Sequence, residues 1–225
     1  MVLFLPLVGV RPVQAQVDEG QLGAWYMLFW SARAGQSPLG VQGDVQFRNW
    51  DTLGDLEQLL VRAGIMLHPS ASGASFTLGA AHVTSGTFGS DASTSSEFRL
   101  YQEALFPQQV GGRAAVRHRL RTEQRWVEGQ DVRTRLRYAV FIDLPLNSPR
   151  VAPGAWYLAA YDEVFINGET DVGQGQTVRR FDRNRLYGAL GLMPRAGYRI
   201  QAGYMLQSTA TIHKGQVQLS LHRSF

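Results

Sequence analysis

Cysteine is absent from the 225 residues, and lysine occurs once, at Lys214. Without cysteine the chain has no disulfide framework and no thiol chemistry, which agrees with export without proving it. Charged residues make up 18% of the sequence, below the roughly 25% of a soluble domain. No apolar run reaches the about 20 residues that a membrane-spanning helix needs. Any membrane-spanning structure must therefore be built from strands, because only helices and closed barrels satisfy their backbone in lipid.

Arginine supplies nearly all of the positive charge, since Lys214 is the one lysine among 22 basic residues. The formal net charge is +4, and the length fits one domain or one barrel. Codon bias in a GC-rich genome would explain the arginine. A physical reason is that guanidinium keeps its charge in any environment and pairs with carboxylates in a planar fork. Arginine therefore suits a crowded, partly dehydrated interior.

The N-terminus resembles a secretory signal peptide. An apolar run over Val2–Val10 precedes Val13-Gln14-Ala15, which matches a small-residue cleavage site. We therefore expect a signal peptide over residues 1–15 and a single barrel domain over 16–225. The run lacks the usual preceding Lys or Arg, and the alternative is a buried N-terminal strand.

Apolar and polar residues alternate along almost every segment, with no sustained helical period. We expect strands near 22–32, 40–50, 56–68, 74–84, 97–106, 113–126, 131–143, 155–165, 181–193, 197–208 and 214–225. Their lengths match tilted transmembrane strands better than the shorter strands of globular proteins. The gaps at Gly86–Ser96 and Asn167–Thr177 resemble long extracellular loops, and Pro145–Pro153 resembles a periplasmic connection.

The fold class predicted is all-β, a transmembrane antiparallel up-and-down β-barrel. Eleven segments conflict with the even strand number of single-chain bacterial barrels, whose two ends lie on the periplasmic side. We therefore expect twelve strands, with ten as the alternative.

Basic residues gather on one face of several predicted strands. In Arg133–Ile142, arginines alternate with Leu136, Tyr138, Val140 and Ile142. In a barrel surrounded by lipid the apolar face points outward and the arginines line the lumen. The expected lumen-lining residues are Arg99, Arg117, Arg119, Arg121, Glu123, Arg125, Arg133, Arg135, Arg137, Glu163, Arg183 and Arg185. Like charges on adjacent strands repel, so we expect pairing with Asp44, Glu97, Glu103, Glu123 and Glu163, and a lumen that is still net positive.

The final segment, Gln216–Phe225, alternates and ends on an aromatic residue. Outer-membrane proteins characteristically end this way, because the barrel-assembly machinery reads an amphipathic last strand with a C-terminal aromatic. Arg223 departs from the pattern, since an apolar residue is expected there. The sequence thus predicts a location in the outer membrane of a Gram-negative bacterium, with its lipid and the assembly machinery as partners.

The chain also resembles a known family, the outer-membrane barrels grouped as domain-of-unknown-function family 2490. The resemblance runs from Trp25 to Phe225. It rests on Gly23–Tyr26, Gln46–Arg48, Glu97–Gln102, His118–Arg125, Arg135–Tyr138, Tyr161–Phe165, Asn184–Gly188 and Leu206–Gln207. It implies a location and a fold but no catalytic residues. In size and lumen the chain is more distantly similar to oligogalacturonate-specific porins, twelve-stranded barrels whose arginine-lined channels pass acidic oligosaccharides; architecture alone does not establish function.

Other chemistry has weaker support in the sequence. The chain has no Gly-x-Ser-x-Gly elbow and no cluster with metal-ligand spacing, so we expect no catalytic residue, no metal and no cofactor. His82 beside Thr84 and Ser85 is a conceivable nucleophile pair, more simply read as polar residues near the interface. The arginine runs could suggest nucleic acid, but they alternate along strands, and no nucleic acid partner is expected. Trp25, Trp30, Trp50, Trp126 and Trp156 fall mostly near strand ends, where membrane-interface anchoring is the usual role.

Three functions remain from the sequence. The first is a porin-like, anion-preferring channel for small acidic solutes, because rings of arginine favour anions in pores. The second is a non-conducting structural or binding barrel whose interior is filled by salt-bridged side chains. The third, an outer-membrane hydrolase, has the least support, and we expect the protein not to be an enzyme.

Overall fold

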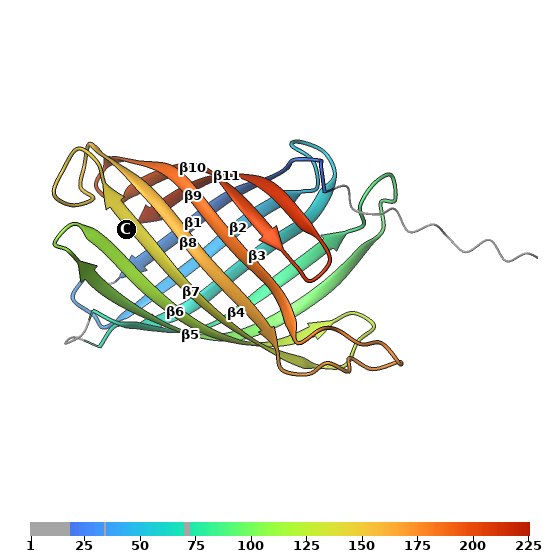
Figure 1. The fold of residues 1–225 in the computed structure, drawn as a ribbon. Coiled ribbons are helices and arrows are strands. Elements are labelled where there is room, and N and C mark those ends of the chain that lie inside the picture. Colours follow the sequence, from blue (N-terminus) through green and yellow to red (C-terminus); the bar gives the residue numbers. More distant parts are fainter. Residues whose placement is uncertain (1–18, 34, 70–72) are drawn as a thin grey trace, which may run out of the picture.

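Eleven β-strands form the described part of the chain in a computed structural model, which describes residues 19–33, 35–69 and 73–225 (Figure 1). The expected signal peptide lies outside these residues. The strands are β1 (Gly23–Arg33), β2 (Leu39–Asn49), β3 (Leu56–Leu67), β4 (Ser75–Gly86), β5 (Thr94–Val110), β6 (Ala114–Val127), β7 (Arg133–Pro145), β8 (Ala155–Asn167), β9 (Phe181–Arg195), β10 (Tyr198–Ser208) and β11 (His213–Ser224). Each corresponds to one of the eleven segments expected from the alternation.

The strands close into one barrel in chain order, each pairing antiparallel with the next, so the all-β barrel is confirmed. The expectation of twelve strands, or ten, is wrong. Closure is made by a parallel pair, in which Gly23–Ser31 of β1 lie beside Gln216–Ser224 of β11. An odd number of alternating strands leaves the first and the last running in the same direction, so they can only pair in parallel. An odd count also occurs in a mitochondrial barrel.

The loops divide between two ends of the barrel. We call the end where β11 finishes the C-terminal end and the other the long-loop end. The connections 87–93 and 168–180 lie together at the long-loop end, and 146–154 lies at the C-terminal end (Figure 1). This agrees with the grouping expected from the sequence. Because the strand count is odd, β1 begins at the long-loop end.

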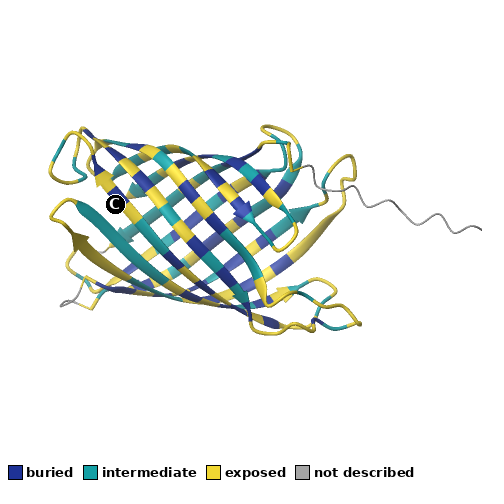
Figure 2. Ribbon diagram, viewed as in Figure 1, coloured by how far each residue is buried: buried dark blue, intermediate teal, exposed yellow. Residues whose placement is uncertain are grey.

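The two faces of the barrel wall have opposite character, and exposed and buried residues alternate along the strands (Figure 2). In β7 the arginines at 133, 135 and 137 are buried, whereas Leu136 and Tyr138 are 43% and 46% exposed. Every strand carries at least one large apolar side chain exposed in this way. In a water-soluble protein arginine is almost never fully buried unless it is paired. An apolar outer wall around a polar interior is the pattern of barrels that stand in lipid.

Aromatic rings and glycines fit together inside the wall. Tyr101 of β5 and Tyr157 of β8 are buried, and each lies over the glycine that faces it on the neighbouring strand, Gly79 and Gly191. A Cβ atom at either glycine would collide with the ring. Glycine therefore leaves room for an inward-pointing aromatic where two strands approach closely.

Among the described residues, no helix is long and apolar enough to cross a membrane.

Candidate functional site in the barrel interior

The residues expected to line the lumen all lie on the inner side of the wall. Most are buried inside the barrel, including Glu123 at 2% and Arg135 at 4% exposure. Arg117 is the most open, with its side chain 34% exposed near the C-terminal end. The expected acidic partners Asp44, Glu97 and Glu103 also lie inside, in ion pairs with arginine. Alternation in the sequence therefore placed these side chains on the correct face.

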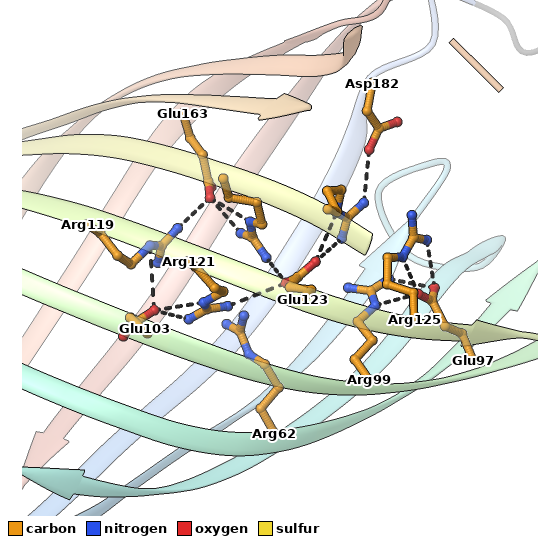
Figure 3. Close-up of polar contacts among 12 residues, drawn as sticks. Arg62, Glu97, Arg99, Glu103, Arg119, Arg121, Glu123, Arg125, Glu163 and Asp182 are labelled. Carbon is orange, nitrogen blue, oxygen red and sulfur yellow. Dashed lines mark hydrogen bonds and ion pairs between the residues drawn. The ribbon is translucent and has the colours of Figure 1, made fainter. Parts of the chain in front are cut away.

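Three glutamates and three arginines make a closed ring of ion pairs across β5 to β8 (Figure 3). In order, the ring contains Glu103, Arg121, Glu123, Arg137, Glu163 and Arg119. We call this group the ion-pair ring. Arg119 Nη2 and Glu163 Oε1 lie 2.5 Å apart in this ring, and its longest contact joins Arg121 Nη1 and Glu123 Oε1 at 3.9 Å.

A second group extends the ring toward the long-loop end. Glu97 binds two arginines, with 2.6 Å to Arg99 Nη2 and 2.5 Å to Arg125 Nε. Arg135 joins Glu123 at 2.6 Å and Asp182 at 2.9 Å, which connects the ring to β9 (Figure 3). Because each carboxylate holds at least one guanidinium, like charges on neighbouring strands are separated by opposite ones.

The net stability of this network is the difference between a large desolvation cost and the attraction between its charges. Taking two charges out of water costs several kcal/mol per ion, and the attraction inside repays it only when the geometry is good and the hydrogen bonds are complete. The carboxylates here meet the fork of arginine at hydrogen-bond distance, as at Glu97, which accepts from Arg99 Nε at 2.7 Å and from Arg99 Nη2 at 2.6 Å. Removing one member would leave its buried partners with less charge compensation.

Several interior residues were not among the expected lumen lining. Arg62 of β3 binds Asp44 at 2.7 Å. Asp143 of β7 holds both Arg117 and Arg199, at 3.1 and 3.2 Å. The inner face of β3 mixes Arg62 with apolar residues and therefore lacks a polar stripe. Val61 and Ile65 are exposed on the outer face of β3, and Arg62 has the opposite parity. This alternation is the signal that could have placed Arg62 inside.

Trp25 also lies inside the barrel, and the expectation of an interface anchor is wrong for it. It is 2% exposed, and its Nε1 donates to Glu57 Oε2 at 2.9 Å. The guanidinium carbons of Arg48 and Arg185 lie 4.0 and 4.7 Å from its ring centroid, in cation–π distance. Trp126 and Trp156, by contrast, are 39% and 44% exposed on the outer wall.

A cavity of about 370 Å³ occupies the interior between this tryptophan and the C-terminal end. Its deep wall includes Trp25, Arg48 and Arg185, and its rim includes Ser31 and Ser224 from the strand ends. The ion-pair ring forms part of its side. Glu97, Arg99 and Arg125 do not line the cavity. They lie beyond it, buried toward the long-loop end.

Arginine outnumbers carboxylate among the described interior residues, as the sequence predicts. The arginines that touch the interior network or cavity are Arg48, Arg62, Arg99, Arg117, Arg119, Arg121, Arg125, Arg133, Arg135, Arg137, Arg183, Arg185, Arg199 and Arg223. The carboxylates are Asp44, Glu57, Glu97, Glu103, Glu123, Asp143, Glu163 and Asp182. The described interior therefore carries net positive charge.

His82 and Ser85, considered together from the sequence, lie on opposite faces of β4. His82 points outward from β4, whereas Ser85 lies on the inner parity and bonds Gln58 at 3.1 Å. A nucleophile and its base must lie within hydrogen-bond reach, so this pair cannot act together. His118 is on the outer wall, hydrogen-bonded to Tyr138 at 2.9 Å. No group of His, Asp and Glu that could hold a metal ion occurs in the part of the chain that the structure describes.

Comparison with known proteins gives one family. The model of a protein family of unknown function, DUF2490, matches residues 22–218. The chain belongs to this family. No curated protein and no solved structure matches it significantly. The matched region includes all of β1 to β10 and the first half of β11, so the family pattern covers the barrel with its interior network.

Proposed function

We propose that this member of DUF2490 is an outer-membrane β-barrel of a Gram-negative bacterium whose interior is closed to ion flow and binds instead of conducting. The apolar outer wall supports the membrane location. So does the final strand, which ends beside the exposed Phe225. In the proposed orientation, the C-terminal end of the barrel faces the periplasm. The long-loop end therefore faces the outside of the cell.

The buried ion pairs carry the proposal that the barrel is closed. A conducting pore needs a continuous water-filled path, about 3 Å or more in radius for a hydrated ion. Between the cavity and the long-loop end, Arg99, Arg125 and Arg135 are between 4% and 7% exposed and bound to Glu97 or Glu123. Side chains that fill a small barrel in this way favour the binding barrel over the anion channel.

The last strand supports recognition by the barrel-assembly machinery. Arg223, which departs from the expected apolar pattern, is stacked between two aromatic rings, 4.2 Å from Tyr198 and 4.3 Å from Phe225. Its guanidinium therefore adds to an aromatic surface at the C-terminal end of the barrel. The side chain of Phe225 is 72% exposed and accessible to a partner.

Chloride flux into liposomes tests the closed interior. Purified protein is reconstituted into vesicles that contain a chloride-quenched dye, beside vesicles with an open porin as the positive control. We expect the dye signal of the protein vesicles to match that of empty vesicles, because the ion pairs block the path. Rapid chloride entry would restore the anion channel as the function.

A further inference from the structure

The cavity on the C-terminal side of the ion-pair ring is a blind chamber with charged walls. Its rim at Ser31 and Ser224 lies at the strand ends, and the side chain of Arg117 in its lining is 34% exposed. Its deep wall at Trp25 is 2% exposed. A volume of about 370 Å³ lies within the range of pockets that take small molecules. The chamber is therefore large enough for a ligand and open from one end.

Two arginines in the deep wall have no ion-pair partner among the described residues. Arg48 is 6% exposed and donates only to the amide oxygens of Gln46 and Gln58. Arg185 is 6% exposed and donates to Gln207 Oε1 at 2.8 Å. Burying a cation without an anion is costly. The two guanidinium groups lie against the Trp25 ring and line the same cavity, so one anion entering there would offset both.

Other groups in the chamber have spare hydrogen-bond donors. The hydroxyl of Tyr187 is buried and has no hydrogen-bond partner among the described residues, although its neighbour Tyr161 is stacked on it at 4.8 Å between ring centroids. Arg121 Nη1 is also buried without a hydrogen bond. Buried polar groups that lack a partner are rare and need an explanation. Here a bound acceptor would supply the partner.

Aromatic and apolar side chains also form part of the cavity wall, among polar and charged ones. Met27, Phe141 and Tyr161 line the cavity beside the cationic groups. Inorganic ions would leave these walls in contact with water, whereas an organic body would cover them. The wall chemistry is thus amphipathic, with guanidinium forks for an acidic group and rings for an apolar or cyclic body.

We propose that this chamber binds a small organic anion, with one carboxylate or phosphate held by Arg48, Arg185 and Tyr187 and an apolar or ring-shaped body packed against Trp25 and Tyr161. The inference rests on the proposed closed barrel, because a ligand in an open pore would pass through. At the mouth, Arg117 and Arg199 share the one carboxylate of Asp143. The surplus positive charge there favours entry of an anion.

Calorimetric titration of the purified protein in detergent micelles tests the chamber. The probes are benzoate, phenyl phosphate, the neutral benzyl alcohol and the cationic benzylamine. We expect one of the two anions to bind in a one-to-one ratio, and the neutral and cationic probes to bind at least about tenfold more weakly, about 1.4 kcal/mol. The tighter of the two anions identifies the acidic group as carboxylate or phosphate. No binding of either anion up to about 10 mM would overturn the proposal.

Variants locate the bound anion. Arg185→Gln should weaken anion binding about tenfold or more, and Tyr187→Phe about threefold, since each removes a donor to the acidic group. Arg150→Gln, in the exposed loop at the C-terminal end, is the matched control and should leave binding unchanged. If Arg185→Gln does not fold, the anion affinity of Tyr187→Phe alone tests the site. Unchanged binding in the chamber variants would overturn the site.

The two proposals can fail separately. Anion binding together with rapid chloride flux would keep the site and overturn the closed barrel. Absence of binding together with absence of flux would keep the closed barrel and overturn the site.

Discussion

Individual side chains inside the barrel were predictable where the alternation was strict. In β7 every second residue from Arg133 to Arg137 is arginine, and the parity alone placed the set inside. Arg62 was not predicted to line the lumen because the inner face of β3 is mixed, with the apolar Leu60 and Met66 also buried. The interior position of Trp25 was not predicted, because a location near a strand end does not tell which face of the strand a tryptophan occupies. A residue's partners on other strands are set by the tertiary register, which no local pattern contains.

Glu123 is the residue on which the interior network depends most. It is 2% exposed and touches Arg121, Arg135 and Arg137. Glu123→Gln keeps the shape of the side chain but leaves three arginines with less compensation. We expect the free energy of unfolding to fall by about 3–5 kcal/mol, the usual cost of removing one partner from a buried ion pair. Urea unfolding in lipid vesicles measures it.

The matched control is Glu128→Gln, in the exposed turn after β6, where the carboxylate accepts a hydrogen bond from Ser96 N–H. Exposed substitutions usually change stability by about 0.5 kcal/mol or less. Equal effects of the two substitutions would contradict the structural role of the network.

At the scale of the strands, local signals were sufficient for the elements but not for their closure. Turn residues and alternation placed all eleven segments. The pairing of β1 with β11 joins residues that are far apart in sequence, such as Ser31 and Ser224. Its parallel direction follows from the strand count. The expectation of twelve strands came from a general rule about bacterial barrels, and the structure departs from that rule.

A disulfide across the β1–β11 seam tests the strand count. Ser31 Oγ and Ser224 Oγ lie 3.3 Å apart, and the chain has no cysteine of its own. The double variant Ser31→Cys, Ser224→Cys should therefore form a disulfide on oxidation, seen as a mobility shift on non-reducing gels. An additional strand between β1 and β11 would separate the two thiols and prevent the bond.

The control for this experiment pairs Ser31→Cys with Ser208→Cys. Ser208 ends β10 at the long-loop end, remote from Ser31. It should give no intramolecular shift, and a shift there would mean that the thiols react without native pairing.

At the scale of the whole molecule, the orientation in the membrane is tested by labelling single cysteines. Ser90 lies in the connection after β4, and Arg150 in the connection after β7, at opposite ends of the barrel. With a membrane-impermeant maleimide on intact cells, we expect Ser90→Cys to be labelled. Arg150→Cys should be labelled only after the outer membrane is permeabilised.

Labelling of both positions on intact cells would contradict insertion across the outer membrane. The reverse order would contradict the orientation in which the C-terminal end faces the periplasm. Because the natural chain has no cysteine, the unmodified protein is the background control.

The closed interior is the central claim, and single-channel recording in planar bilayers tests it most directly. Glu97, Arg99 and Arg125 form the group between the cavity and the long-loop end. Replacing all three by alanine removes the pairs together and leaves no member of that group unpaired. We expect the natural protein to show no resolved current steps and the triple variant to show anion-preferring openings, because the remaining interior is positive. Stable anion-selective openings of the natural protein would contradict the account.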